Sequence, residues 1–308
     1  MEYVSRRSFL SSLASVFPLH FAAKNMPLKE SFEQKNIMNK LGLHLGCIQN
    51  ELVERPQQIL EFIQNIGIKY LELPDPILLK RLNPILLGMG FQVPATHFPS
   101  PYITDNWQPY TAFGNTKPSD IENFEQLIDK AAQQNITYLI FPNIFPQDRG
   151  DLLWYANFAK KLNEAGAACK RKSIQLCYHN HSFEFQPTEN TSPIEVMLGI
   201  LDPELVKIEL NLFWCGLAGI DIEDFIAKYQ AFIALLHLGD LGADTAQTYR
   251  AVTLPQDTYK AIGKGKINFG AILNSSALEK VPYYFINLQQ SENILDDVKS
   301  SVDYLKNL

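Results

Sequence analysis

Past residue 40 the chain repeats one pattern: a short apolar run ends at polar residues, and an amphipathic stretch follows it. Apolar runs of this length, bounded by polar or turn residues, are typical of buried strands. Eight of them occur, at Leu41–Cys47, Lys69–Leu73, Phe91–His97, Tyr138–Pro142, Ile174–His181, Val206–Leu212, Ile233–Leu238 and Tyr283–Leu288. The pattern predicts eight strands separated by helices.

Helical periodicity between these runs supports that alternation. In Pro56–Ile66 the apolar residues Ile59, Phe62, Ile63 and Ile66 fall on one helical face. Similar patterns occur at Ile121–Ala132, Leu152–Ala168 and Phe225–Tyr229. Strands that alternate with helices pair in parallel through right-handed crossovers.

Eight such strands predict a closed (β/α)8 TIM barrel, formed as a single domain over residues 38–308. The alternative is a doubly wound open sheet, which often carries a glycine-rich phosphate loop after its first strand. The corresponding stretch is Gly46-Cys47-Ile48-Gln49-Asn50, which contains no GxGxxG motif. The closed barrel is therefore favoured.

The N-terminus has the features of an export signal. Ser5-Arg6-Arg7-Ser8-Phe9-Leu10 is similar to a bacterial twin-arginine motif, and a mildly apolar run, Leu10–Ala23, follows it. That run is too short and polar for a membrane span. We expect residues 1–30 to be a signal that is removed and the protein to be exported to the periplasm, the alternative being an ordinary N-terminal extension.

Charge and cysteine content narrow the function. The formal net charge of the 308-residue chain is −6, whereas nucleic-acid-binding chains usually carry a basic excess. The four cysteines form no CxxC pair and are expected to be buried apolar residues. No apolar run past the signal reaches membrane-spanning length, so we expect no stable span in the mature protein.

Polar side chains end six of the eight predicted strands. In a parallel barrel these ends meet at one rim, where catalytic groups collect. The residues are Glu72, His97, His179, His181, Glu209, Asn211, His237 and Asn287. A single histidine there is usually structural, but several imidazoles and carboxylates from different strands indicate a site that suits a divalent metal. Such an ion polarises a sugar carbonyl or stabilises an enediolate.

Several segments resemble one family in order along the chain. LCYHNHSFEF, residues 176–185, resembles the YHNHDFEF signature of sugar phosphate isomerase/epimerase-like proteins, which belong to the xylose isomerase-like TIM barrel superfamily. DPELVKIELNLFW, residues 202–214, resembles DPELVKLELDLYW, and LLHLGD, residues 235–240, resembles LLHVKD. IGKGKINF, residues 262–269, resembles VGxGxIDF.

The resemblance implies a divalent metal held by acidic and histidine side chains from strands five to eight. His179 or His181 matches the first of these positions and His237 the third. The second and fourth, usually acidic, are Asn211 and Asn287. An amide oxygen is a poorer cation ligand and cannot act as a general base. The metal site, for Zn, Mn or Mg, is therefore expected to be weak, altered or absent.

The resemblance also implies that carboxylates move a proton beside a carbonyl. Glu72, Glu209 and His97 are the candidate catalytic residues, although Glu209 could instead belong to a structural hydrogen-bond network. Two long stretches, Phe98–Pro118 and Leu241–Gly265, are candidate lids over the site.

Three further residues are candidate substrate contacts: Trp107, Glu184 and Lys264. Trp107 has the alternative role of anchoring its own loop.

Two functions remain open. The first is a sugar isomerase or epimerase that acts on a small-molecule carbohydrate by proton transfer beside a carbonyl. Export would favour a free or glycosidic sugar over a sugar phosphate. The second is a catalytically inactive or metal-independent carbohydrate-binding barrel, which the loss of both acidic ligands favours. An endonuclease of the same superfamily fits poorly, because the chain is acidic and lacks those carboxylates.

Overall fold

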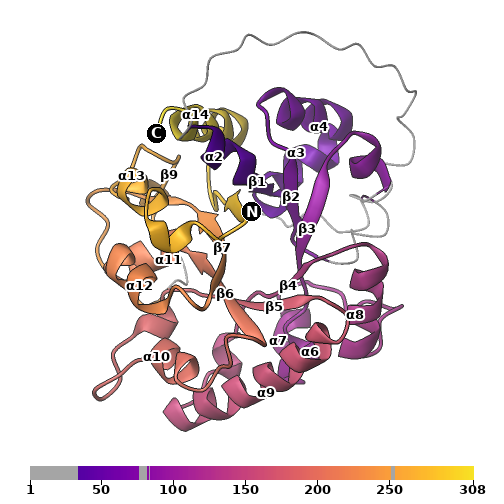
Figure 1. Cartoon of the computed structure of the whole chain (residues 1–308), viewed down its shortest axis with the longest axis vertical. Coiled ribbons are helices and arrows are strands. Elements are labelled where there is room, and N and C mark those ends of the chain that lie inside the picture. The colour runs from indigo at the N-terminus through magenta and orange to yellow at the C-terminus, as the bar shows by residue number, and fades with distance from the viewer. Residues whose placement is uncertain (1–33, 76–81, 83, 251–253) are drawn as a thin grey trace.

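The protein is described by a computed structural model covering residues 34–75, 82, 84–250 and 254–308 (Figure 1). The expected export signal, residues 1–30, lies outside the described residues. Within those described ranges, no helix combines the length and apolar character needed to cross a bilayer.

Eight parallel strands close into a barrel in the order β1-β10-β7-β6-β5-β4-β3-β2, which confirms the predicted TIM barrel. A two-stranded antiparallel sheet, β8 with β9, follows strand β7. The strands are β1 Leu41–His44, β2 Tyr70–Leu73, β3 Gln92–His97, β4 Tyr138–Phe141, β5 Gln175–His179, β6 Val206–Asn211, β7 Ile233–Leu238, β8 Asp240–Leu241, β9 Tyr259–Lys260 and β10 Tyr283–Ile286.

Helices form an outer ring around the strands (Figure 1). They are α2 Gln34–Lys40, α3 Gln49–Glu54, α4 Pro56–Asn65, α6 Pro101–Thr104, α7 Trp107–Ala112, α8 Phe124–Gln133, α9 Leu152–Lys170, α10 Pro193–Leu198, α11 Leu212–Leu217, α12 Ile222–Tyr229, α13 Phe269–Leu273 and α14 Ile294–Lys306. Single 3-10 turns lie at Leu45–Ile48, Pro146–Asp148, Phe183–Phe185, Gln256–Thr258 and Ser276–Leu278.

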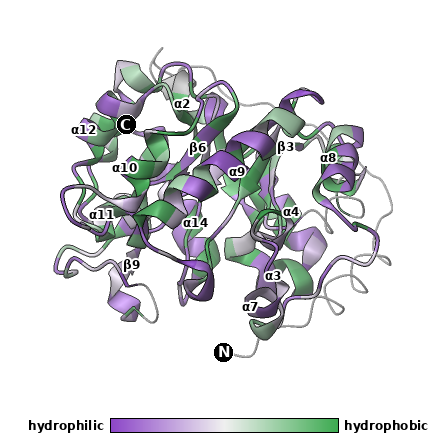
Figure 2. Ribbon diagram, turned by 90° about the horizontal axis from the view of Figure 1, so that it is seen from below, coloured by the Kyte–Doolittle hydropathy of each residue, from purple (hydrophilic) through white to green (hydrophobic). Residues whose placement is uncertain are grey.

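The helices pack on the barrel through one apolar face each, and Figure 2 shows apolar and polar residues mixed along them. Helix α4 begins at Pro56 and buries Ile59, Leu60 and Ile63. Helix α8 begins later than its apolar pattern predicts, because the Asn123 side chain caps it by accepting a hydrogen bond from the backbone N–H of Gln126.

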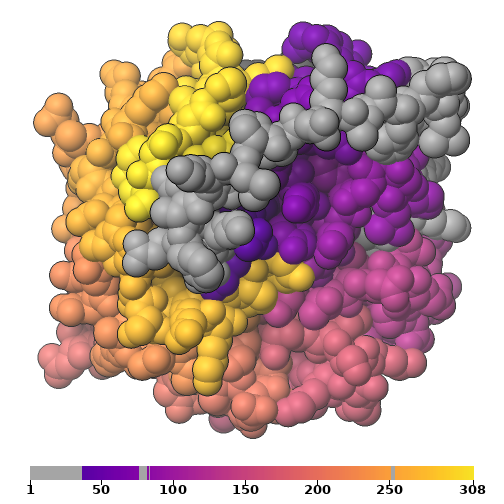
Figure 3. Space-filling view, turned by 45° about the horizontal axis from the view of Figure 1, so that its top comes forward, coloured from indigo at the N-terminus to yellow at the C-terminus, as the bar shows by residue number. Residues whose placement is uncertain are grey.

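The first and last strands meet and close the barrel. Leu41 of β1 lies beside Tyr284 of β10, and helix α2 packs against α14. The same closure brings the N-terminal and C-terminal parts of the described chain side by side on the surface (Figure 3).

A small apolar cluster fills the barrel interior: Ala95, Ile140, Cys177, Leu235 and Phe285. Gly42 makes room for the Phe285 ring, since a Cβ at Gly42 would lie 2.5 Å from it. The polar side chains described below lie beyond this apolar layer, toward the C-terminal ends of the strands.

Candidate active site

Six titratable side chains converge inside the barrel in the C-terminal halves of their strands. They are His44 on β1, Glu72 on β2, His97 on β3, His179 on β5, Glu209 on β6 and His237 on β7. We call them the His/Glu cluster. Both glutamates and His237 have no exposed surface, whereas His44 and His97 each keep 8%. Any molecule approaching the cluster therefore meets His44 and His97 first.

Two His–Glu pairs lie across neighbouring strands. His44 stands in register with Glu72, and its Nδ1 lies 2.8 Å from Glu72 Oε2. His179 stands in register with Glu209, and its Nδ1 lies 2.7 Å from Glu209 Oε2. Because an ionised carboxylate only accepts hydrogen bonds, each imidazole donates through Nδ1 and leaves Nε2 as its basic nitrogen.

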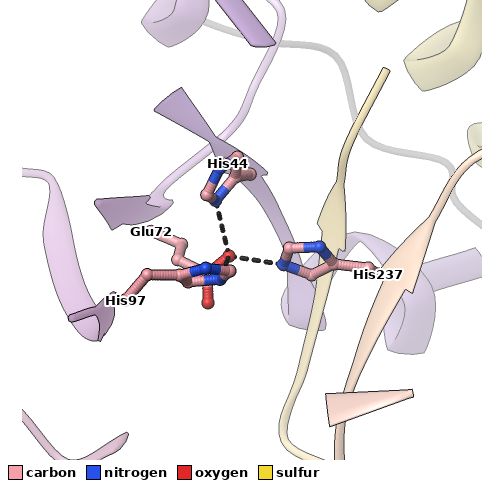
Figure 4. Close-up of side chains that lie close together, drawn as sticks. All are labelled: His44, Glu72, His97 and His237. Atoms are coloured by element: carbon pink, nitrogen blue, oxygen red, sulfur yellow. Dashed lines mark hydrogen bonds and ion pairs between the residues drawn. The ribbon is translucent and has the colours of Figure 1, made fainter. Parts of the chain in front are cut away.

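His97 and His237 lie between the two pairs. His97 Nε2 is 3.4 Å from Glu72 Oε2 and 3.2 Å from Glu209 Oε2. His237 Nε2 contacts Glu72 Oε2 directly and lies 3.2 Å from Glu209 Oε1. Figure 4 shows the Glu72 carboxylate between the rings of His44 and His237, with His97 beside it.

The cluster has an approximate two-fold repeat. Strands β1, β2 and β3 carry His44, Glu72 and His97, and strands β5, β6 and β7 carry His179, Glu209 and His237 in the same sequence. The two halves of the barrel thus supply one His–Glu–His set each. The repeat places the pairs on opposite sides of the barrel, four strands apart.

Burial and charge split the four imidazoles into two kinds. Burial lowers the pKa of both His44 and His179 to about 4, so they are neutral near pH 7. Burial also opposes charge on the other two, but the carboxylates outweigh it and raise the pKa of His97 to about 9 and that of His237 to about 10.

The same contacts keep both glutamates ionised. Burial and the mutual repulsion of the two carboxylates favour the neutral acid, but His237 and His97 outweigh both effects and lower the pKa of Glu72 to about 2. Burial opposes ionisation of Glu209 as well, and His237 and the other histidines lower its pKa well below the usual range. The metal-free cluster therefore pairs two carboxylates with two imidazolium ions.

The cluster has the donor atoms of a metal site. Two overlapping groups each bring four ligand atoms within 4.8 Å of one another: His44, Glu72, His97 and His237, and His97, His179, Glu209 and His237. Three buried atoms in it, Glu72 Oε1, His97 Nε2 and Glu209 Oε1, make no hydrogen bond. Imidazole and carboxylate donors suit Zn, Mn or a related divalent ion, so this buried group could bind a metal.

Gly46 shapes the access to His44. A Cβ at Gly46 would lie 2.5 Å from His44 Nε2, so the glycine leaves that nitrogen uncovered on its side. This is the nitrogen that does not face Glu72. The arrangement presents a neutral, basic nitrogen toward the open end of the barrel.

The two asparagines that the sequence resemblance assigns to metal positions lie against the cluster and bond to it. Asn211 Nδ2 is 3.2 Å from His179 Nε2, and its Oδ1 accepts from the backbone N–H of Trp214 to cap helix α11. Asn287 Nδ2 is 2.8 Å from His237 Nδ1. Both amides therefore orient histidines of the cluster.

The structure separates the two histidines expected at strand five. Strand β5 ends at His179, two residues earlier than predicted, because Asn180 bonds the backbone of Asn211 and the Glu184 carboxylate accepts from the His181 backbone N–H. The half-buried His181 ring packs on Phe183 and Trp214 and belongs to neither four-residue group.

The three expected substrate contacts lie outside the cluster. Trp107 packs edge-on against Tyr102 and Tyr110, as an anchor of its own loop would. Lys264 is exposed and pairs with Asp297 at 3.6 Å. Glu184 is fully buried and accepts a hydrogen bond from the Tyr178 hydroxyl at 2.5 Å. Burial raises the pKa of Glu184 to about 7.

Sequence reasoning missed His44. The first strand was expected to run to Cys47, but it ends at His44, where a 3-10 turn begins. With the correct end, the rule that found the other strand-end residues finds His44 too. The spacing along the sequence was a second signal. Glu72 follows His44 by 28 residues, much as Glu209 follows His179 by 30.

Asp240 was also missed, and it organises one expected lid. Its two carboxylate oxygens accept hydrogen bonds from four backbone N–H groups, those of Leu241, Gly263, Gly265 and Ile267. A Cβ at Gly265 would lie 2.3 Å from Asp240 Oδ1, so only glycine fits there. The far end of the Leu241–Gly265 segment is thereby fixed on strand β8.

Comparison with known proteins agrees with this architecture. The family model for the xylose isomerase-like TIM barrel matches residues 96–307. The chain belongs to this family. No curated protein matches it.

Solved structures with a similar fold align with most of the chain. A sugar phosphate isomerase/epimerase from Parabacteroides distasonis is 19% identical, with a TM-score of 0.67 over 87% of this chain and 94% of its own. IOLI protein, solved with a zinc atom, is 14% identical, with a TM-score of 0.60 over 87% and 98%. D-Psicose 3-epimerase from Clostridium cellulolyticum H10, solved with D-tagatose, is 12% identical, with a TM-score of 0.56 over 87% and 98%. At these identities the likeness shows the fold.

Proposed function

We propose that the protein is a sugar isomerase/epimerase-like enzyme that moves a proton beside a carbonyl of a small carbohydrate. The observation that carries this proposal is the pairing of His44 with Glu72 at the cluster's accessible face. A neutral imidazole held by a carboxylate through Nδ1 is a general base whose free nitrogen has a fixed direction. Sugar epimerase and isomerase structures of the same fold support this choice of substrate.

In the proposed reaction His44 Nε2 takes the proton from the carbon next to the carbonyl. The C–H electron pair forms the enediolate double bond, and the carbonyl electrons move to its oxygen. When charged His44 gives its proton to the neighbouring carbon, the hydroxyl proton passes to the former carbonyl oxygen and the isomer forms. When solvent gives a proton to the opposite face of the first carbon and His44 releases its own proton to solvent, the epimer forms. Glu72 stabilises the charged imidazole that forms, through the 2.8 Å contact.

Glu72 and Glu209 act behind the histidines in this scheme. Neither carboxylate has exposed surface, so a substrate in the barrel mouth cannot reach them directly. His97 is the second ring with exposed surface, and its centroid lies 4.8 Å from that of His44. The enediolate oxygen is placed over His97, whose raised pKa gives the ring a positive charge near pH 7.

A divalent metal would polarise the substrate carbonyl at this centre. The donor set fits Zn or Mn best, because four of its six side chains are imidazoles. The family has acidic ligands at the outer position. Asn211 and Asn287 stand there in this chain, so the outer position is a poor site for such an ion.

We further propose that the twin-arginine motif directs export, so that the substrate is a free or glycosidic sugar. Fractionation of cells expressing the full chain tests this.

The test is hydrogen exchange into unphosphorylated keto- and aldo-sugars in D2O, followed by NMR. The wild-type protein is expected to label the carbon beside the carbonyl, and His44→Ala is expected to lower the rate by about 10²–10⁴-fold. Lys170→Ala, an exposed position on α9, serves as the matched control. Undiminished exchange in a folded His44→Ala protein would overturn the proposed base.

The second candidate is a carbohydrate-binding barrel without catalysis. It is favoured by the two amides at acidic family positions, Asn211 and Asn287. Calorimetric binding of a sugar that undergoes no exchange with wild-type protein would support this function over the first.

A further inference from the structure

We propose that the His/Glu cluster binds one divalent cation at the barrel centre, one layer deeper than the family position, with the four central side chains as ligands: His97, His237, Glu72 and Glu209. The two outer histidines, His44 and His179, hold the carboxylates and do not touch the ion. This site deepens the proposed function, because the ion can take the substrate oxygen as a fifth ligand, but its occupancy can be measured without any sugar.

The two-fold repeat points to the centre. Each possible four-residue metal group contains both His97 and His237 together with one of the glutamates. Although neither group contains both glutamates, each of the two rings lies against both carboxylates, so an ion between the rings would be adjacent to both. Each half of the barrel then contributes one histidine and one glutamate.

Three of the four central contacts have the spacing of ligands around one ion. A tetrahedral ion with bonds of 2.0–2.1 Å keeps its ligand atoms about 3.3 Å apart. His97 Nε2 lies 3.4 and 3.2 Å from the two carboxylates, and His237 Nε2 lies 3.2 Å from Glu209. His237 Nε2 also contacts Glu72 Oε2 directly, so this pair must separate when the ion enters. At the outer histidines the contacting atom is Nδ1, which donates a hydrogen bond to its carboxylate at 2.8 Å in His44 and 2.7 Å in His179.

Buried polar atoms without a hydrogen bond support the same centre. Glu72 Oε1, Glu209 Oε1 and His97 Nε2 are buried atoms without a hydrogen bond, and two carboxylates balance the charge of one divalent cation. Buried polar atoms without partners are rare unless an ion or water fills the place. The outer histidines match the hydrogen-bonded shell that usually orients metal ligands.

The outer, family-type position is the competing location. It is formed by the two amides with His179 and His237, and contains no carboxylate among these four side chains. Asn211 and Asn287 already bond the ring nitrogens of those histidines. The two carboxylates therefore favour binding of the cation at the deeper centre over the outer position.

The experiment loads chelator-treated mature protein with Co²⁺ or Zn²⁺ and measures bound metal by elemental analysis and, for Co²⁺, by visible absorption. One ion per chain is expected in wild-type protein. His97→Ala and Glu209→Gln should lose it, whereas Asn287→Ala should retain one ion per chain. His44→Ala should retain the site with an affinity about 10–100-fold lower.

Three outcomes would overturn the site: no metal in wild-type protein, two ions per chain, or loss of metal in Asn287→Ala with retention in both His97→Ala and Glu209→Gln. Circular dichroism identifies variants that fail to fold, and His97→Gln replaces His97→Ala in that case. Bound metal without sugar exchange would refute the proposed reaction and leave the site standing. Exchange that is unaffected by removing the metal would refute the link between them.

Discussion

His44 and Glu72 face each other in register on neighbouring strands, and a contact of 2.8 Å joins Nδ1 of the imidazole to Oε2 of the carboxylate. The contact fixes the tautomer and the direction of the ring. It also leaves His44 as the accessible end of a buried ionic network. The properties of the barrel mouth therefore depend on a carboxylate that solvent does not reach.

Replacing that carboxylate should impair catalysis without removing substrate affinity. In Glu72→Gln the side chain keeps its size but loses the negative charge that stabilises protonated His44. We expect the sugar exchange rate at saturation to fall by about 10²-fold or more, with little change in the half-saturating sugar concentration. Glu204→Gln, at an exposed position, is the control. A loss confined to sugar affinity would contradict the role given to Glu72.

Gly46→Ala should close the approach to His44. The added methyl group would lie 2.5 Å from Nε2 unless the ring or the backbone moves. Exchange is expected to fall at least about tenfold, since a displaced base loses its geometry. Gly88→Ala is the matched control, because nothing lies within 4 Å of a Cβ there. Equal exchange by both variants would show that the proton moves elsewhere.

Glu184 should make stability depend on pH. Its pKa is about 7 in the folded protein and 4.5 in its ordinary environment, so between these values only the folded state holds the proton. The stabilisation from this proton is full below pH 4.5 and is lost as pH rises toward 7, by about 3 kcal/mol in all.

Glu184→Gln removes this titration and retains an oxygen for the His181 N–H group. The difference in free energy of unfolding, wild type minus variant, should therefore decrease from pH 4.5 to 8 in urea titrations. A difference that stays constant across this range would exclude Glu184 as the titrating group.

Asp240→Asn should loosen the segment that follows strand β8. Oδ1 and Oδ2 each accept two backbone N–H groups, and an amide nitrogen in place of one oxygen leaves two donors unsatisfied. Each loss destabilises by about 1–3 kcal/mol. We expect a lower free energy of unfolding and faster proteolysis near residues 261–267. Asp257→Asn, fully exposed in the same segment, should change neither.

The periodicity of apolar residues predicted the architecture well, because apolar positions repeat differently along strands and along helices. All eight barrel strands were found, and the errors lie at their ends. Strand five was extended to His181, where the side chains of Asn180 and Glu184 turn the chain. Contacts from residues distant in sequence decide such ends, and a local pattern does not contain them.

The site was predicted in part. Strand-end reasoning found Glu72, His97, His179, Glu209 and His237, all of which meet in the cluster. It missed His44 through a strand drawn three residues too long. The strand-end pattern also did not predict which residues lie deeper in the barrel. The two glutamates lie behind the histidines, and the stagger of the strands, which sets the side chains that form one layer, is not visible in the sequence.

The two-fold repeat has a consequence for how the barrel unfolds. His237 of the second half contacts Glu72 of the first, and His97 of the first half lies 3.2 Å from Glu209 of the second. Each half thus neutralises a buried carboxylate of the other. A half that separated alone would leave its carboxylate with one charged histidine, the one that it carries itself, in place of two. The halves should therefore melt in one cooperative transition, although each carries its own His–Glu–His set.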